Sequence, residues 1–199
     1  MKIALVTDTH FGARNDHDHF NNYFYEFYDN IFFPYLKEHN IDTCIHLGDV
    51  MDRRKFVSYK TAKDFREKFC ETFVTNDINV HMIVGNHDTY FKNTNEVNSL
   101  DELIGSRYEN IKIYRETETV DFDIPICFIP WINSTNEKQT VEHISKTNAT
   151  VAMGHLEIKG FEMHHGFPSE TGMEKSAFNK FDMVMSGQFH KKSDDGHIF

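Results

Sequence analysis

The chain has 199 residues, 39% of them hydrophobic, including 19 phenylalanines, and a net charge of −10. This length and apolar content indicate one packed domain over residues 1–199 and exclude a disordered chain. No apolar run approaches the roughly 20 residues that a membrane-spanning helix needs, and the N-terminus lacks a signal-peptide pattern. Cys44, Cys70 and Cys127 are isolated and odd in number, which favours reduced thiols in a cytoplasmic protein.

The charge is distributed unevenly along the chain. Residues 53–68 contain seven basic and two acidic residues, a net charge of +5, which leaves −15 for the remainder. Such a stretch is either a solvated helix face or an edge that contacts phosphates. We keep both interpretations open.

Strands and helices are predicted to alternate in the first half. Short apolar runs indicate buried strands, and apolar residues three or four apart indicate helices. In chain order we expect a strand at 3–7, a helix at 20–39 that ends or kinks before Pro34, a strand at 41–47, an amphipathic helix at 56–73, a strand at 78–84 and a short helix at 97–104 that stops at Gly105.

The second half is richer in strands. Strands are predicted at 111–114, 118–122, 126–129, 150–153 and 182–186, with a helix at 139–145. This order favours a layered α/β sandwich over a single doubly wound sheet. Residues 194–196 predict a tight turn, and 197–199 open a strand that is cut short. We therefore expect the sequence to be part of a longer protein.

Five polar motifs each close an apolar run that is predicted to be a strand. They are Asp8-Thr9-His10, Gly48-Asp49-Val50-Met51-Asp52, Gly85-Asn86-His87-Asp88, Gly154-His155 and Gly187-Gln188-Phe189-His190. The ends of strands are where α/β sheets place their sites. Each motif alone could be an ordinary turn at the end of a strand. Five such motifs in order indicate a two-metal phosphoesterase.

The side chains in these motifs are donors for divalent cations. Asp49 is placed to bridge two ions, Asn86 offers a neutral oxygen, and His155 and His190 supply imidazole. Mixed nitrogen and oxygen donors without thiolate favour Mn²⁺, Fe²⁺ or Zn²⁺ over Ca²⁺. Two such ions would activate water and hold the oxygens of a phosphoryl group.

Two further residues are candidate catalytic groups. His87 is placed to donate a proton or stabilise the transition state, and Asp88 could orient its ring. The other histidines are interpreted as structural or surface residues: His17, His19, His39, His46, His81, His143, His164, His165 and His197.

The motif set resembles the calcineurin-like metallophosphoesterase superfamily, and within it the SbcD-type nuclease subunit of recombination and double-strand-break repair complexes in its phage form. Four motifs carry the resemblance in residue type and order: Asp8-Thr9-His10-Phe11-Gly12, Gly48-Asp49-Val50-Met51-Asp52, Gly85-Asn86-His87-Asp88 and Gly154-His155-Leu156-Glu157. The resemblance implies an α/β/β/α sandwich with a two-metal site at strand ends.

The resemblance also implies a ligand set, a chemistry and partners. One Mn²⁺ would be held by Asp8, His10, Asp49 and His190, and a second by Asn86 and His155 with Asp49 bridging. His87 would be the catalytic histidine. The activity would be exonuclease action on double-strand ends and endonuclease action on single strands. The partners would be DNA, a second copy of the chain and an SbcC-type coiled-coil ATPase in the cytoplasm, the host's if the chain is phage-encoded.

The sequence departs from this family pattern in two places. Gln188 stands where the family motif has its first histidine, and an amide oxygen binds transition metals less well than imidazole does. A weak second metal site is therefore expected. The family's C-terminal DNA-capping domain and ATPase-binding segment are also missing from the sequence.

Two other functions remain open at this point. A metallophosphatase or cyclic-nucleotide phosphodiesterase of the same superfamily would carry nearly the same ligands. A catalytically impaired subunit that binds DNA ends would carry Gln188 as the trace of lost chemistry.

Overall fold

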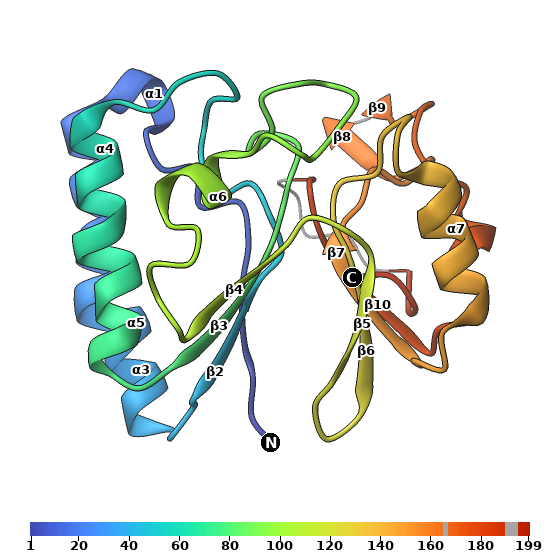
Figure 1. Ribbon diagram of the computed structural model, residues 1–199, viewed down its shortest axis with the longest axis horizontal. Coiled ribbons are helices and arrows are strands. Elements are labelled where there is room, and N and C mark those ends of the chain that lie inside the picture. Colours follow the sequence, from blue (N-terminus) through green and yellow to red (C-terminus); the bar gives the residue numbers. More distant parts are fainter. Residues whose placement is uncertain (165–166, 190–194) are drawn as a thin grey trace.

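The computed structural model describes residues 1–164, 167–189 and 195–199. Two four-stranded sheets stand side by side with helices on their outer faces (Figure 1). This is the layered α/β/β/α arrangement that the sequence predicts.

The first sheet is entirely parallel. Its strands are β1 (Ala4–Val6), β2 (Thr43–His46), β3 (Asn79–Ile83) and β4 (Ile111–Tyr114), paired in chain order. Parallel pairing places the carboxyl ends of β1, β2 and β3 at one edge, and each of these strands is followed by one of the polar motifs.

The second sheet is mixed. Its order is β10-β7-β6-β5, in which only β5 and β6 are antiparallel. The strands are β5 (Glu118–Asp121), β6 (Pro125–Ile129), β7 (Val151–His155) and β10 (Met183–Gly187). Two short strands, β8 (Glu162–His164) and β9 (Phe167–Pro168), form a separate antiparallel pair that was not predicted from the sequence.

The helices divide between the two outer faces. In chain order the helical segments are α1 (Ala13–Asp16), α2 (Asp18–Phe27), η1 (Tyr28–Phe32), α3 (Phe33–Glu38), α4 (Tyr59–Asp64), η2 (Phe65–Cys70), α5 (Glu71–Thr75), α6 (Ser99–Leu103), α7 (Glu137–Lys146) and η3 (Lys175–Phe178). The helices from α1 to α5 lie on the side of the first sheet, and α7 lies on the side of the second (Figure 1).

Three apolar layers hold the sandwich together. Phe65, Phe69 and Phe73 are fully buried between the helices and the first sheet, as the four-residue spacing predicts. A second cluster lies between the second sheet and its own helices. The third lies between the sheets and contains Ile45 and Phe128. Its burial fixes how the strand ends of one sheet face those of the other.

The helix at 20–39 does not end before Pro34. Instead, its hydrogen bonding changes to a π-helical turn, η1, and α3 then begins with Pro34 in its first turn. Proline has no N–H to donate within a helix, and the π-helical turn ends directly before the segment in which Pro34 lies. The helix was predicted to end or kink before Pro34: it does not end there, and the irregular turn lies just before the proline.

Two smaller expectations can be compared with the structure. The three cysteines are buried and unpaired. Residues 197–199 extend alongside β10, with a bridge between Val184 and Ile198.

Among the described residues, no helix combines the length and apolar character needed to cross a bilayer.

Candidate active site

The loops that follow β1 and β2 run side by side. The backbone N–H groups of Asp8 and His10 donate to the carbonyls of Gly48 and Asp49, at 3.0 and 3.1 Å. A further bridge joins Phe11 to Met51. These bonds continue the sheet pairing past the strand ends, so the first two motifs lie next to each other.

Three residues of these loops have left-handed backbone conformations. Asp8, His10 and Asp49 have φ values of 51°, 43° and 53°, which are uncommon outside glycine. Strained backbone of this kind clusters at functional sites, where the surrounding structure holds it in place. The turns direct three potential metal ligands into one region.

The third loop packs directly on the second. Gly85 lies so close to Asp49 that any Cβ would overlap the Asp49 backbone nitrogen and carboxylate. Beyond it, the His87 backbone N–H donates to Asp49 Oδ1 at 2.8 Å. Glycine is required at 85 by this close approach, and the approach brings Asn86 and His87 to the metal-binding motifs.

The second sheet contributes His155, the last residue of β7. Its side chain is fully buried, and Nδ1 donates to the Leu47 carbonyl at 2.8 Å. A Cβ on Gly48 would lie 2.5 Å from the same ring nitrogen, so glycine leaves room for the imidazole. Because Nδ1 carries the donated proton, the Nε2 electron pair of the neutral ring points toward Asp49 and Asn86.

Two groups of candidate metal donors share Asp49. One contains His10, Asp49 and His87, the other contains Asp8, Asp49 and His155, and within each group the donor atoms lie within 4.8 Å of one another. Asp49 is almost completely buried between them. A carboxylate shared by two clusters is the arrangement that a pair of neighbouring cations needs.

The surroundings of Asn86 test whether a cation fits. One atom of its amide group lies 2.9 Å from His155 Nε2, 3.2 Å from each oxygen of the Asp49 carboxylate and 2.7 Å from Gln188 Oε1. With the amide oxygen at that position, electron-pair donors converge from four side chains. Either amide protons or a cation can satisfy such a convergence. The donor set therefore fits a divalent metal ion, and Gln188 belongs to it.

Charge interactions reinforce the pairing of Asp49 with His155. Asp49 Oδ1 lies 3.3 Å from His155 Nε2. Burial opposes ionisation of Asp49, but the adjacent imidazole outweighs it and lowers the pKa of the carboxyl to about 2. Burial also opposes the charged form of His155, but Asp49 outweighs it and raises the pKa of the imidazole to about 9. A cation that binds His155 Nε2 would therefore have to displace the proton that this pairing favours.

The structure corrects the expectation that Asp88 orients His87. The Asp88 carboxylate is fully buried and accepts the backbone N–H groups of Met51 and Gly85, each at 2.9 Å. Burial and the charge of Asp49 raise its pKa to about 7. Asp88 therefore braces two loops, because those buried amides need an acceptor. The His87 ring is held instead by the Asp52 backbone carbonyl, which accepts from Nδ1.

Other residues at the site were not predicted from the sequence. One Asp52 carboxylate oxygen lies 3.7 Å from His10 Nδ1. His46, expected to be structural, is fully buried, donates to Thr9 Oγ1 at 3.0 Å and accepts the Gly48 N–H at 3.2 Å. Burial lowers the pKa of His46 to about 3. Only the spacing of Asp52 within its motif could have identified it.

The predicted ligands are brought together as far as the structure describes them. Asp8 and Gln188 meet through the Gln188 backbone N–H, which donates to Asp8 Oδ2 at 3.3 Å. Gly187 permits this contact, because a Cβ there would overlap Thr7. His190, the remaining predicted ligand, lies outside the described residues.

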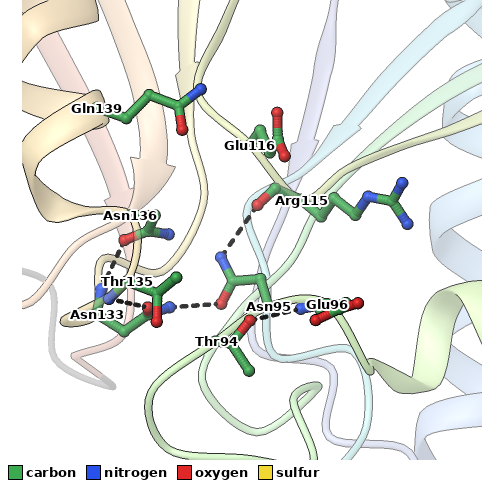
Figure 2. Close-up of a pocket in the computed structure, with 9 residues that line it drawn as sticks. All are labelled: Thr94, Asn95, Glu96, Arg115, Glu116, Asn133, Thr135, Asn136 and Gln139. Atoms are coloured by element: carbon green, nitrogen blue, oxygen red, sulfur yellow. Dashed lines mark hydrogen bonds between the residues drawn. The ribbon is translucent and has the colours of Figure 1, made fainter.

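A separate polar cavity of about 420 Å³ lies beside the loops after β3 and β6 (Figure 2). Its lining includes Asn95, Arg115 and Asn133 but none of the candidate metal ligands. Dashed lines in Figure 2 join Asn95 to the Arg115 carbonyl and to Asn133. The buried asparagines already satisfy one another and nearby backbone, which indicates a structural network.

A parallel-sheet sandwich with His, Asp and Asn donors at its strand ends defines a metallophosphoesterase. The calcineurin-like phosphoesterase family model matches residues 1–192, and the chain belongs to this family. It is 34% identical over 199 residues to exonuclease subunit 1 of Enterobacteria phage T4. The match covers all of this chain and 58% of that relative, so the chain spans little more than half of the relative's length.

A solved structure supports the fold independently. Purple acid phosphatase PPD1 from yellow lupin seeds superposes with a TM-score of 0.55 at 13% identity, covering 93% of this chain and 37% of that one. The family match confirms the predicted superfamily, and the predicted resemblance to a phage nuclease subunit agrees with the T4 relative.

Proposed function

We propose that the chain is the catalytic core of a Mn²⁺-dependent DNA nuclease that acts in recombination and double-strand-break repair. The observation that carries this proposal is the pair of donor groups sharing Asp49. All 199 residues of the chain match an exonuclease subunit, of which they cover 58%. Exonuclease action on double-strand ends and endonuclease action on single strands are the proposed activities.

The side chains divide the chemistry among them. Asp8, His10 and Asp49 would hold one cation together with His190, and Asp49, Asn86, His155 and Gln188 a second. His87 lies in the first donor group by distance, but we propose that it acts as the catalytic histidine and not as a ligand. Bound divalent cations would supply Lewis acidity toward water and the phosphate oxygens. The Asp49 carboxylate accepts the His87 backbone N–H. The Asp52 backbone carbonyl accepts from His87 Nδ1 and so orients the His87 ring. His87 Nε2 is then the atom that delivers a proton to the leaving oxygen.

Replacing His87 with glutamine tests this assignment. We expect Mn²⁺-dependent cleavage of an oligonucleotide to fall by about 100-fold or more, because a proton donor contributes on that scale, while Mn²⁺ binding measured by calorimetry persists. His19→Gln, at an exposed histidine, should leave cleavage unchanged. Full activity in His87→Gln would overturn the role of His87. Hydrolysis of small phosphodiesters without any cleavage of DNA would favour the phosphodiesterase alternative.

The impaired-scaffold alternative has one observation in its favour, the amide of Gln188 in the second donor set. Tight DNA binding without Mn²⁺-dependent turnover, in a chain extended to the full length of its relative, would support it. Recovery of cleavage in Gln188→His would instead identify a damaged enzyme.

The expected homodimer has a candidate surface. Phe65, Phe69 and Phe73 of the 56–73 helix pack in the core, so they do not supply it. The helical segments α2, η1 and α3 instead expose a row of large side chains three or four residues apart. We call this row the apolar stripe: Phe20, Tyr23, Phe27, Ile31 and Tyr35. An exposed row of this kind marks an interaction surface, and we propose that a second copy of the chain covers it.

A charge in the middle of the apolar stripe should separate the two copies. Tyr23 is 71% exposed, so Tyr23→Glu is not expected to disturb the core. We expect sedimentation velocity to show dimers of the parent chain and monomers of Tyr23→Glu. Val141→Glu, on α7 at the other side of the molecule, is the control and should remain dimeric. A monomeric parent chain would contradict the proposal.

An SbcC-type ATPase remains a proposed partner. The chain spans 58% of its T4 relative, and we propose that the ATPase binds through a segment outside residues 1–199. Pull-down of the ATPase by a chain of full relative length, and not by residues 1–199, would test that placement.

A further inference from the structure

Arg54 lies where the loops after β2 and β3, which form part of the candidate active site, meet the loop after β6. Its Nη1 donates to Thr89 Oγ1 at 2.9 Å, and Thr89 Oγ1 in turn donates to the Asn86 carbonyl at 3.1 Å. The guanidinium carbon lies 4.8 Å from the centre of the Trp131 ring. Arg54 is thus linked through one hydroxyl to the backbone of a candidate metal ligand.

Among the described residues, none neutralises the charge of Arg54 through a direct ion pair. Within residues 1–164, 167–189 and 195–199, no carboxylate lies at ion-pair distance from its guanidinium. Burial lowers the pKa of Arg54, whereas the charges of Asp49 and Asp88 raise it. Arginine remains protonated under such influences. A fixed positive charge therefore lies within the field of the site's carboxylates.

Neighbouring basic residues are engaged differently. Arg53 forms an ion pair with Asp16 and donates to Asn15. On the following helix, Lys60 and Lys63 pair with carboxylates of that same surface. Arg53, Lys60 and Lys63 therefore fit the interpretation of the basic stretch as a solvated helix face. Arg54 is the residue that fits the interpretation of a phosphate-contacting edge.

The Trp131 ring lies beneath Arg54, and the Trp131 backbone is held by hydrogen bonds. The backbone N–H of Trp131 donates to the Val84 carbonyl at 2.9 Å. Its carbonyl accepts from Asn95 and Asn136 Nδ2 groups at 3.0 and 3.1 Å. Figure 2 shows Asn95 and Asn136 within the polar network. Because both backbone groups of Trp131 are bonded, the segment that carries the ring under Arg54 is fixed in place.

Exposed rings and a second cation extend this arrangement. Lys55 Nζ lies 5.7 Å from the centre of the Tyr90 ring, and Tyr90 packs edge-on against Phe91 at 4.8 Å. Tyr90 and Phe91 are 41% and 48% exposed. Cations interleaved with exposed aromatic rings are the features that bind the phosphates and bases of a single strand.

We propose that Arg54, stacked on Trp131, binds a backbone phosphate next to the scissile one and so selects a polynucleotide with an unpaired strand as the substrate. Tyr90 and Phe91 offer stacking surfaces to its bases. This assignment rests on the proposed nuclease function and names the strand-binding residue of that site.

The test compares neighbouring arginines. Binding of a fluorescent oligothymidylate of about 12 nucleotides is measured by anisotropy in EDTA at several salt concentrations. We expect Arg54→Ala to weaken binding about tenfold and to reduce the slope of log K against log salt by about 0.7, the value of one single-strand phosphate contact. Arg53→Ala removes the same charge and should leave both quantities unchanged. Arg54→Lys, which keeps the charge but not the planar stack, should lie between them.

Cleavage assays separate the possible failures. With Mn²⁺, Arg54→Ala should raise KM for the oligonucleotide by a larger factor than it lowers hydrolysis of bis(p-nitrophenyl) phosphate, which has no neighbouring phosphate. Equal loss in Arg53→Ala and Arg54→Ala, or no loss in Arg54→Ala, would overturn the assignment while the nuclease function stands. A parent chain that hydrolyses the small diester but neither binds nor cuts the oligonucleotide would overturn both.

Discussion

Asp49→Asn should abolish Mn²⁺-dependent hydrolysis, reducing kcat/KM by at least roughly 1,000-fold, or about 4 kcal/mol of transition-state stabilisation. Both candidate donor groups use the Asp49 carboxylate, so one substitution weakens both cation sites. Asparagine keeps an oxygen that can accept the His87 N–H and occupies nearly the same volume. The loss is therefore expected from the missing charge and not from collapse of the loop.

A binding measurement makes this result independent of turnover. Mn²⁺ should raise the thermal unfolding midpoint of the parent chain, because a ligand that binds only the folded state stabilises it. Asp49→Asn should show no such rise. Asp52→Asn is the matched control, since Asp52 lies near His10 but in neither donor group. Its effect should resemble that of an outer ligand partner, about 10- to 100-fold in activity. Equal losses in both variants would contradict the bridging role of Asp49.

The position of the site could be predicted from the sequence because it depends on local order. A buried strand followed at once by Asp, Asn or His leaves little choice about where those side chains lie. Asp8, Asp49 and Asn86 follow neighbouring parallel strands, so their convergence follows from sheet topology. The same argument predicted the helix face containing Phe69, since burial of every fourth residue is a property of one helix.

What could not be predicted depends on contacts between distant segments. Asp88 follows His87 directly, yet its carboxylate turns away to accept the Met51 and Gly85 amides. Nothing in the motif shows that those amides lack another acceptor. Trp131 and Arg54 likewise belong to different sheets' loops, and their stacking arises only when the two sheets pack. Residues that support a site are harder to predict than those that form it.

Gln188→His should convert a weak second cation site into a strong one. Gln188 Oε1 lies 2.7 Å from the Asn86 amide, within the donor set that includes Asp49 and His155. An amide oxygen is a poorer partner for Mn²⁺ than imidazole. We expect one tightly bound Mn²⁺ per parent chain and two per Gln188→His chain, measured by calorimetric titration. Cleavage should rise in the variant, most clearly in a chain extended to the full length of its relative.

The backbone at position 188 favours this substitution. Gln188 has a φ of 95°, and histidine enters the left-handed region more readily than most side chains. Gln139→His, at an exposed position on α7, controls for adventitious binding of metal by an added imidazole and should leave the stoichiometry at one. Two tightly bound ions in the parent chain would instead make Gln188 a working ligand. The site would then be selected for a harder cation, and the gain in Gln188→His should vanish with Mg²⁺.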